Sequence, residues 1–414
     1  MVKLLLTYLD RIIYWLIIII PFFIAIAPAP VNIFMGFLIA GFLVARYLRK
    51  ERLFGKTAIN LSLLLFFLVT ILSIFNSVSL KDSFKGGALR LLQYIFILFA
   101  LAESVRDRKH LKRIIFSITA GLILASLDSV WQVITGHDFI RGYAPVVNIG
   151  LVRATASFKD SNNLGIYLSA FAPLIFGLTG YYFKHKEKIL FIFVSVLTLT
   201  GIILTYSRPT LLAIYTALFF LGIARRDKVL ISLLIIFMLI APFIAPKSVK
   251  DWAKQVDYNP VRFMCNDDRI AIYRNSLNMI RQHPVIGVGA NTFMKNYKTY
   301  KESPEYRNVV TSDTVYAHNN FLHMAGELGL IGLGVFIWLL YKLFVESKNI
   351  YYLLKDEYLK VIALSLIACL ISFLVNGLAE SSLFHSRVAI VFWYICGLIL
   401  SLRKFTIAKE QATV

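Results

Sequence analysis

Apolar residues are grouped into blocks of about 18–25 residues, separated by shorter polar segments. Each block is long enough to cross a hydrocarbon core of roughly 30 Å as a helix. Backbone groups in lipid must be hydrogen-bonded within their own segment, and the alternation typical of a membrane barrel strand is absent. The pattern predicts an all-α polytopic membrane protein with about twelve transmembrane helices. The expected spans are residues 9–28, 31–48, 58–76, 88–104, 111–134, 161–182, 188–205, 209–224, 228–246, 320–344, 358–379 and 384–402.

The longest polar stretch, residues 247–319, separates the ninth and tenth expected spans. It is too long for a simple connection. Apolar and basic residues recur at helical spacing between Arg269 and Arg281, and Pro284 is expected to end that helix. The chain therefore divides into residues 1–246 with helices 1–9, a helical subdomain at 247–319, and residues 320–414 with helices 10–12 and a tail.

Lys and Arg gather in alternate connections, such as residues 46–56 and 106–113, whereas Pro28–Pro30 has neither. The positive-inside rule places the basic connections and both termini in the cytoplasm, and an even number of spans agrees with that topology. The net charge of +21 is then explained by topology rather than by nucleic-acid binding. The connections at 135–160, 205–209 and 247–319 face outward, and we expect the site of chemistry among them.

Three cysteines occur without a CxxC pair or a Cys/His cluster, and no HxxxH or HExxH pattern is present. We therefore expect no disulfide framework, no metal and no cofactor. The segment from Gly287 to Asn291 lacks the third glycine and the preceding strand of a nucleotide fingerprint. It predicts a turn.

Arg208 lies between Ser207 and Pro209, in the short connection between the seventh and eighth spans. Proline suits the first turn of a helix, so this arginine is expected at the outer end of the bundle. One interpretation is an interfacial arginine that extends to lipid headgroups. The other is a guanidinium that binds a phosphate through two donors.

Arg269 and Arg274 lie on the predicted helix of the subdomain at residues 247–319, called the outer subdomain below. They form either a solvated helix face with local ion pairs or further phosphate contacts. Because they are five residues apart, their side chains point in different directions and are not expected to share one role.

His318 precedes Asn319 and a glycine-rich apolar helix. Asn319 is a typical helix cap and a further candidate substrate contact. His318 is either an interfacial side chain at a helix entrance or a general base, because an imidazole titrates near neutral pH. His323 is five residues farther on and is expected to face elsewhere.

Arg153, in the outward connection before the sixth span, and Glu380, between the last two spans, are weaker candidates for substrate binding. Either residue alone is equally compatible with a structural role. His283 and His385 are competing candidates for a base on the same face.

Five motifs in order resemble the O-antigen ligase family, within a superfamily that also holds O-antigen polymerases and some protein O-oligosaccharyltransferases. The motifs are Arg153-Ala154-Thr155 through Asn162-Asn163-Leu164, Thr205-Tyr206-Ser207-Arg208, Arg269 through Tyr273, Pro284 through Gly289, and Ala317-His318-Asn319-Asn320-Phe321 through Glu327-Leu328-Gly329. Tyr273 stands where many relatives carry tryptophan.

This resemblance implies a metal-independent glycosyltransferase of the GT-C type in the bacterial inner membrane, with its active site on the periplasmic face. The donor would be a glycan on undecaprenyl pyrophosphate and, for a ligase, the acceptor would be a sugar hydroxyl of lipid A–core. Carried onto this sequence, Arg208 and Arg269 would bind the pyrophosphate, and His318 would be the base. An inverting in-line attack fits those roles.

Ligase is the favoured interpretation. A polymerase would use a second lipid-linked glycan as acceptor, and a protein-glycosylating relative is a third possibility. A transporter of lipid-linked oligosaccharides remains the alternative outside enzymology. No convincing internal repeat of the kind common in transporters is found. Charged residues inside the spans are scarce, and Asp128, the clearest case, falls near the outer end of the fifth span rather than at mid-membrane.

Overall fold

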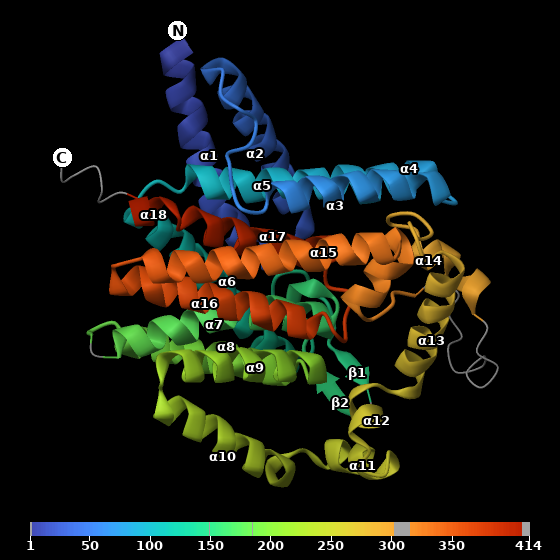
Figure 1. The fold of residues 1–414 in the computed structure, drawn as a ribbon. Coiled ribbons are helices and arrows are strands. Elements are labelled where there is room, and N and C mark those ends of the chain that lie inside the picture. Colours follow the sequence, from blue (N-terminus) through green and yellow to red (C-terminus); the bar gives the residue numbers. More distant parts are fainter. Residues whose placement is uncertain (1, 149, 184, 302–314, 408–414) are drawn as a thin grey trace.

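The computed structural model describes residues 2–148, 150–183, 185–301 and 315–407, which are almost entirely helical (Figure 1). A long helix is found at each of the twelve expected spans. These helices are α1 (Val2–Ile24), α2 (Pro28–Arg49), α3 (Asn60–Ser73), α5 (Arg90–Ser104), α6 (Arg108–Thr135), α7 (Ser161–Tyr182), α8 (Lys188–Leu204), α9 (Arg208–Arg225), α10 (Lys228–Ile244), α15 (Asn320–Leu353), α16 (Glu357–Asn376) and α17 (Ser386–Ser401). The prediction of an all-α polytopic membrane protein is confirmed.

Within the described residues, eight helical segments are long and apolar enough to cross a membrane singly. They comprise α1, α2, α5 with the turns before it, α6, α7, α15, α16 and α17 with the turn after it. Helix α10 adds a ninth if it is joined to α11 (Lys247–Gln255) across an 85° bend, and α8 and the segment Asn60–Asn76 are apolar but shorter. The total of twelve crossings stays a prediction.

The shorter elements gather mainly at one end of the bundle (Figure 1). Beyond α10, the chain forms α11, α12 (Pro260–Met264), α13 (Asp267–Gln282), α14 (Phe293–Asn296) and η4 (Tyr297–Tyr300). Helix α13 ends just before His283-Pro284, as predicted. Residues 302–314 of the expected outer subdomain and 408–414 of the expected tail lie outside the described residues.

An antiparallel hairpin of β1 (Val146–Asn148) and β2 (Leu151–Arg153) lies at the same end of the bundle (Figure 1). Its three-residue strands are partly exposed and have no clear alternation of buried positions. The hydrophobic pattern therefore did not predict it. The remaining short elements are η1 (Ile74–Asn76), α4 (Leu80–Asp82), the π-helical turn η2 (Ser83–Leu89), η3 (Ala156–Phe158) and α18 (Lys404–Ile407).

Helices α7 and α16 form the centre of the bundle. Helix α7 packs against α16, α8 and α9, and α17 packs against α5. Gly177 lies where α7 approaches α16, and a Cβ there would overlap the hydroxyl of Ser365. Such close contact fixes how the ends of these helices, and the loops that follow them, are placed relative to one another.

Helix α15 is broken at Gly329, which has φ 69° and ψ −176°. Segment 284–289 satisfies the backbone groups released by this break. Leu330 N–H donates to the Pro284 carbonyl at 2.7 Å, and Val288 N–H donates to the Gly326 carbonyl at 2.9 Å. The glycine-rich turn thus docks the outer subdomain onto α15.

Gly329→Ala is expected to weaken this junction. A Cβ there would overlap the Val285 carbonyl oxygen, and this backbone conformation costs about 1–3 kcal/mol for a residue with a side chain. Thermal unfolding in detergent should show a lower midpoint for this variant. Gly334→Ala is the matched control, because a Cβ on Gly334 meets nothing within 4 Å. Equal midpoints for the two variants would contradict the docking role of the break.

Candidate active site

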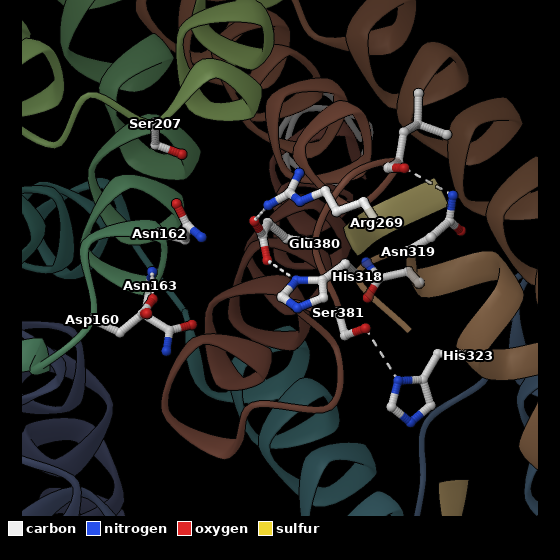
Figure 2. Close-up of polar contacts among 12 residues, drawn as sticks. Asp160, Asn162, Asn163, Ser207, Arg269, His318, Asn319, His323, Glu380 and Ser381 are labelled. Carbon is white, nitrogen blue, oxygen red and sulfur yellow. Dashed lines mark hydrogen bonds and ion pairs between the residues drawn. The ribbon is translucent and has the colours of Figure 1, made fainter. Parts of the chain in front are cut away.

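Three segments distant in sequence meet at the end of the bundle that carries the outer subdomain (Figure 2). Arg269 comes from α13, His318 from the entrance to α15, and Glu380 from the loop between α16 and α17. Arg269 Nη2 forms an ion pair with Glu380 Oε1, and His318 Nδ1 lies 3.0 Å from Glu380 Oε2. One carboxylate therefore links a cation to an imidazole.

Glu380 is only 4% exposed. Burial raises the pKa of its carboxyl, but the charge of Arg269 and the hydrogen bond from His318 outweigh burial and leave the pKa below its ordinary value. An ionised carboxylate can only accept, so His318 Nδ1 must carry the hydrogen. In the neutral imidazole the lone pair then lies on Nε2, where a general base needs it.

The backbone at His318 holds the ring in place. His318 has a φ of 47°, in the left-handed region that few residues with side chains adopt. Its carbonyl oxygen accepts a hydrogen bond from the Tyr273 hydroxyl at 3.0 Å. Tyr273 therefore supports His318 directly.

Asn319 caps α15, as predicted. Its side-chain oxygen accepts from Phe321 N–H at 2.8 Å and Leu322 N–H at 3.0 Å. Its Nδ2 donates to the Leu378 carbonyl at 2.8 Å. Both ends of the amide are thus engaged, and the geometry favours a role in holding the Glu380 loop over substrate contact.

The ion pair with Glu380 uses Nη2 of Arg269 and leaves Nη1 available. Nη1 is buried and has no hydrogen-bond partner among the described residues. A buried donor without an acceptor costs about 1–3 kcal/mol, more when it is charged. An oxygen of a bound anion would relieve that cost, so this atom marks a place for an anion.

Arg208 begins α9, directly before Pro209. Its Nη1 donates to the Phe263 carbonyl, and its guanidinium carbon lies 5.8 Å from the ring centre of Trp252. The outer subdomain therefore covers this arginine, which is not free at the bilayer interface. Burial lowers the pKa of Arg208, and the positive charges of Arg269 and Arg153 lower it further.

Arg153 joins two of the sequence motifs. Its Nε donates to the Thr205 carbonyl and its Nη2 donates to Asn162 Oδ1, both at 2.9 Å. Burial lowers the pKa of Arg153, while Asp160 and Glu380 oppose that shift. Figure 2 shows Asn162, Asn163 and Ser207 opposite Arg269, Glu380 and His318.

The remaining sequence candidates lie differently. Arg274 is exposed on α13, away from the buried face of that helix. His283 Nε2 lies 2.7 Å from the Tyr300 hydroxyl, within the outer subdomain. The His385 ring is 4.3 Å from that of Tyr316, and burial lowers the pKa of His385. Of the histidines that the structure describes, only His318 pairs with Glu380.

A cavity of about 580 Å³ adjoins this cluster. Its wall includes Asn163, Tyr316 and, from the loop that carries Glu380, residues 383–385, but not Glu380 itself. Farther in, it is lined by apolar side chains of α3, α15 and α17, including Phe66, Phe336 and Trp393. Its polar part carries four cations, Arg90, Arg141, Lys159 and Arg387.

Glu380→Gln is expected to lower the unfolding midpoint at pH 7, since Arg269 and His318 lose a charged partner. Because the pKa of Glu380 is depressed in the fold, its charge stabilises the protein above the ordinary value of 4.5. That contribution is lost as the pH falls further, so wild type and variant should converge well below pH 4.5. Exposed Glu357→Gln serves as control. A midpoint difference that is the same at both pH values would contradict an ionised Glu380.

Comparison with known proteins gives two matches. The family model described as O-antigen ligase matches residues 193–337, a segment that contains Arg208, Arg269 and His318. An O-antigen polymerase of Salmonella muenchen is 23% identical over 299 residues, which cover 67% of this chain and 71% of that protein. These matches bear out the resemblance drawn from the motifs. The chain is thus similar both to the O-antigen ligase family and to an O-antigen polymerase.

Proposed function

We propose that this protein is an O-antigen ligase that transfers a glycan from undecaprenyl pyrophosphate to a sugar hydroxyl of lipid A–core. The reaction takes place on the periplasmic face of the bacterial inner membrane, needs no metal and inverts the anomeric carbon. The observation that carries this proposal is the Arg269–Glu380–His318 chain. It joins an anion-binding cation to a base through one buried carboxylate.

The chemistry follows from these groups. The bond between the anomeric carbon and the pyrophosphate oxygen breaks, and its electron pair leaves with the pyrophosphate. The guanidinium groups of Arg208 and Arg269, with Arg153 beside them, stabilise the growing negative charge in the transition state. His318 Nε2 takes the proton from the acceptor hydroxyl, whose oxygen forms the new bond. Glu380 stabilises the resulting imidazolium.

The cavity supports a lipid acceptor, because it combines an apolar interior with cations. Arg90, Arg141 and Lys159 form no ion pair with a described carboxylate within 4.0 Å. A phosphorylated lipid would supply the missing anions, while its acyl chains occupy the apolar part. The acceptor would then approach from the side of Tyr316 and His385.

Arg90→Ala is expected to raise KM for the acceptor about tenfold, with a smaller effect on kcat. A charge-assisted hydrogen bond is worth about 1.5–3 kcal/mol, and 1.4 kcal/mol is a factor of ten. Steady-state kinetics with varied lipid A–core would measure this. Exposed Lys85→Ala, in the turn η2 that leads into α5 but outside the cavity wall, is the control. An unchanged acceptor KM would place the acceptor elsewhere.

Polymerase is the second candidate, because the curated relative is an O-antigen polymerase. It would use the same donor chemistry with a second lipid-linked glycan as acceptor. Proteoliposomes would receive the labelled donor with lipid A–core in one arm and with additional donor alone in the other. A glycan ladder on lipid A–core supports the ligase. Longer glycans on undecaprenyl pyrophosphate alone would establish the polymerase instead.

A further inference from the structure

A buried histidine, His323, lies behind the candidate active site. His323 is 1% exposed, and its ring stacks on Phe384 with 3.6 Å between ring centres. Its Nδ1 lies 3.1 Å from Ser381 Oγ, and its Nε2 lies 3.3 Å from Glu327 Oε1. Figure 2 shows the bond to Ser381, which directly follows Glu380 in the chain.

Glu327 extends this network into the outer subdomain. Its two carboxylate oxygens accept from Asn291 N–H at 2.7 Å and from Phe293 N–H at 3.0 Å. It therefore binds the turn that precedes α14, within the same subdomain that carries Arg269. The network thus connects the loop that carries Glu380, through Ser381, with the subdomain that carries Arg269.

The hydrogen positions follow from the partners. If Glu327 is an ionised acceptor, His323 Nε2 donates to it and Nδ1 accepts from the Ser381 hydroxyl. A serine, a histidine and a glutamate in contact could also suggest a nucleophile. Ser381 and His323 are each only 1% exposed, and neither lines the 580 Å³ cavity. A positioning role is therefore favoured over nucleophilic chemistry.

We propose that His323 is a positioning residue that, through Ser381, aims the carboxylate of Glu380 at both Arg269 and His318. This proposal rests on the proposed transfer function for its kinetic consequences. The rest of the loop is held independently, because Asn320 Nδ2 donates to Ser382 Oγ at 2.8 Å and Leu383 N–H donates to Asn320 Oδ1 at 3.0 Å. Loss of the Ser381 bond should therefore alter the aim of Glu380 without releasing the loop.

The first test needs no substrate. The ring ¹⁵N signals of His318 are recorded in purified protein with labelled histidine and assigned with His318→Gln. Ser381→Ala should shift these signals, because Glu380 no longer holds His318 Nδ1 at the same distance. Ser372→Ala is the matched control. Ser372 is also buried but donates to the Ser169 carbonyl, so its loss should leave the His318 signals unchanged. Unshifted His318 signals in Ser381→Ala would overturn the proposal even if the protein has no transferase activity.

The second test is a double-mutant cycle on turnover. Ser381→Ala should lower kcat about tenfold, the loss expected for one hydrogen bond of about 1.4 kcal/mol. In a Glu380→Gln background the same change should cost almost nothing more, because its effect acts through Glu380. His323→Gln, which can both donate and accept, should retain more activity than His323→Phe. Equal losses in both backgrounds would show a merely structural role, whereas inactive wild type would refute the proposed function alone.

Discussion

Arg269→Ala should lower turnover by about 10²–10³-fold, the loss typical when one preorganised donor to a developing anion is removed. Arg269 pairs with the buried carboxylate of Glu380, and its buried Nη1 has no hydrogen-bond partner in the described part of the chain. Its loss would remove charge stabilisation from the leaving pyrophosphate and would also leave His318 Nδ1 facing a carboxylate without its main counter-charge. Turnover of the lipid-linked donor in proteoliposomes measures the effect.

Two further variants separate catalysis from folding. Removing one partner of a buried ion pair can destabilise a protein by about 3–5 kcal/mol. Arg269→Lys keeps the charge but not the two-pronged donor, so it should fold and recover part of the activity. Exposed Arg281→Ala, on the last turn of the same helix, should behave as wild type. Full turnover in a folded Arg269→Ala protein would remove this residue from the proposed mechanism.

His318→Gln should lower kcat by about 10²–10⁴-fold while donor KM changes little, because a general base acts in the transition state and not in donor binding. Glutamine can still donate to Glu380, so the fold should survive. Single-turnover rates with saturating donor and acceptor measure the chemical step.

The control for His318 is His283→Gln. His283 bonds to Tyr300 within the outer subdomain and should be dispensable for the chemical step. If His318→Gln kept more than a tenth of wild-type turnover, the general-base role would have to be abandoned. Loss of the chemical step in His283→Gln, with the protein still folded, would reopen the choice of base.

Much of the fold was predictable because membrane helices are specified by local sequence. A block of apolar residues of sufficient length must be helical in lipid, whatever its neighbours are. Likewise, Arg208 before Pro209 and Asn319 at the start of α15 are local cap and turn features, so their positions at helix ends followed from sequence. The positive charge of Arg269 contributes to the lowered pKa of Arg208, although 61 residues (269 − 208) separate the two in the sequence.

The role of Glu380 could not be predicted in the same way. It is one acidic residue in a short loop, and its two partners, Arg269 and His318, lie 111 and 62 residues away in the sequence. Only the packing of α16 and α17 against the rest of the bundle brings that loop to α13 and α15. Similarly, His323 was expected to face away from His318. Its bond to Glu327 is a local i, i+4 contact on α15, but its bond to Ser381 depends on a tertiary contact.

The glycine-rich segment shows how a motif can be excluded from one role without its actual role being evident. Its spacing excluded a nucleotide fingerprint and predicted a turn. The segment docks onto the break in α15 at Gly329. That residue lies 42 positions (329 − 287) after Gly287 in the sequence. A break of this kind has no strong local signal, because glycines are common in transmembrane helices.

In the proposed function, the site around Arg269, Glu380 and His318 makes a glycosidic bond by displacing a pyrophosphate without a metal. The most direct measurement is the stoichiometry of donor consumption in proteoliposomes with excess EDTA. We expect one undecaprenyl pyrophosphate to be released for each new glycosidic bond, and neither product to form with Arg269→Ala. Donor that crosses the bilayer without any covalent product, or transfer that EDTA abolishes, would contradict it.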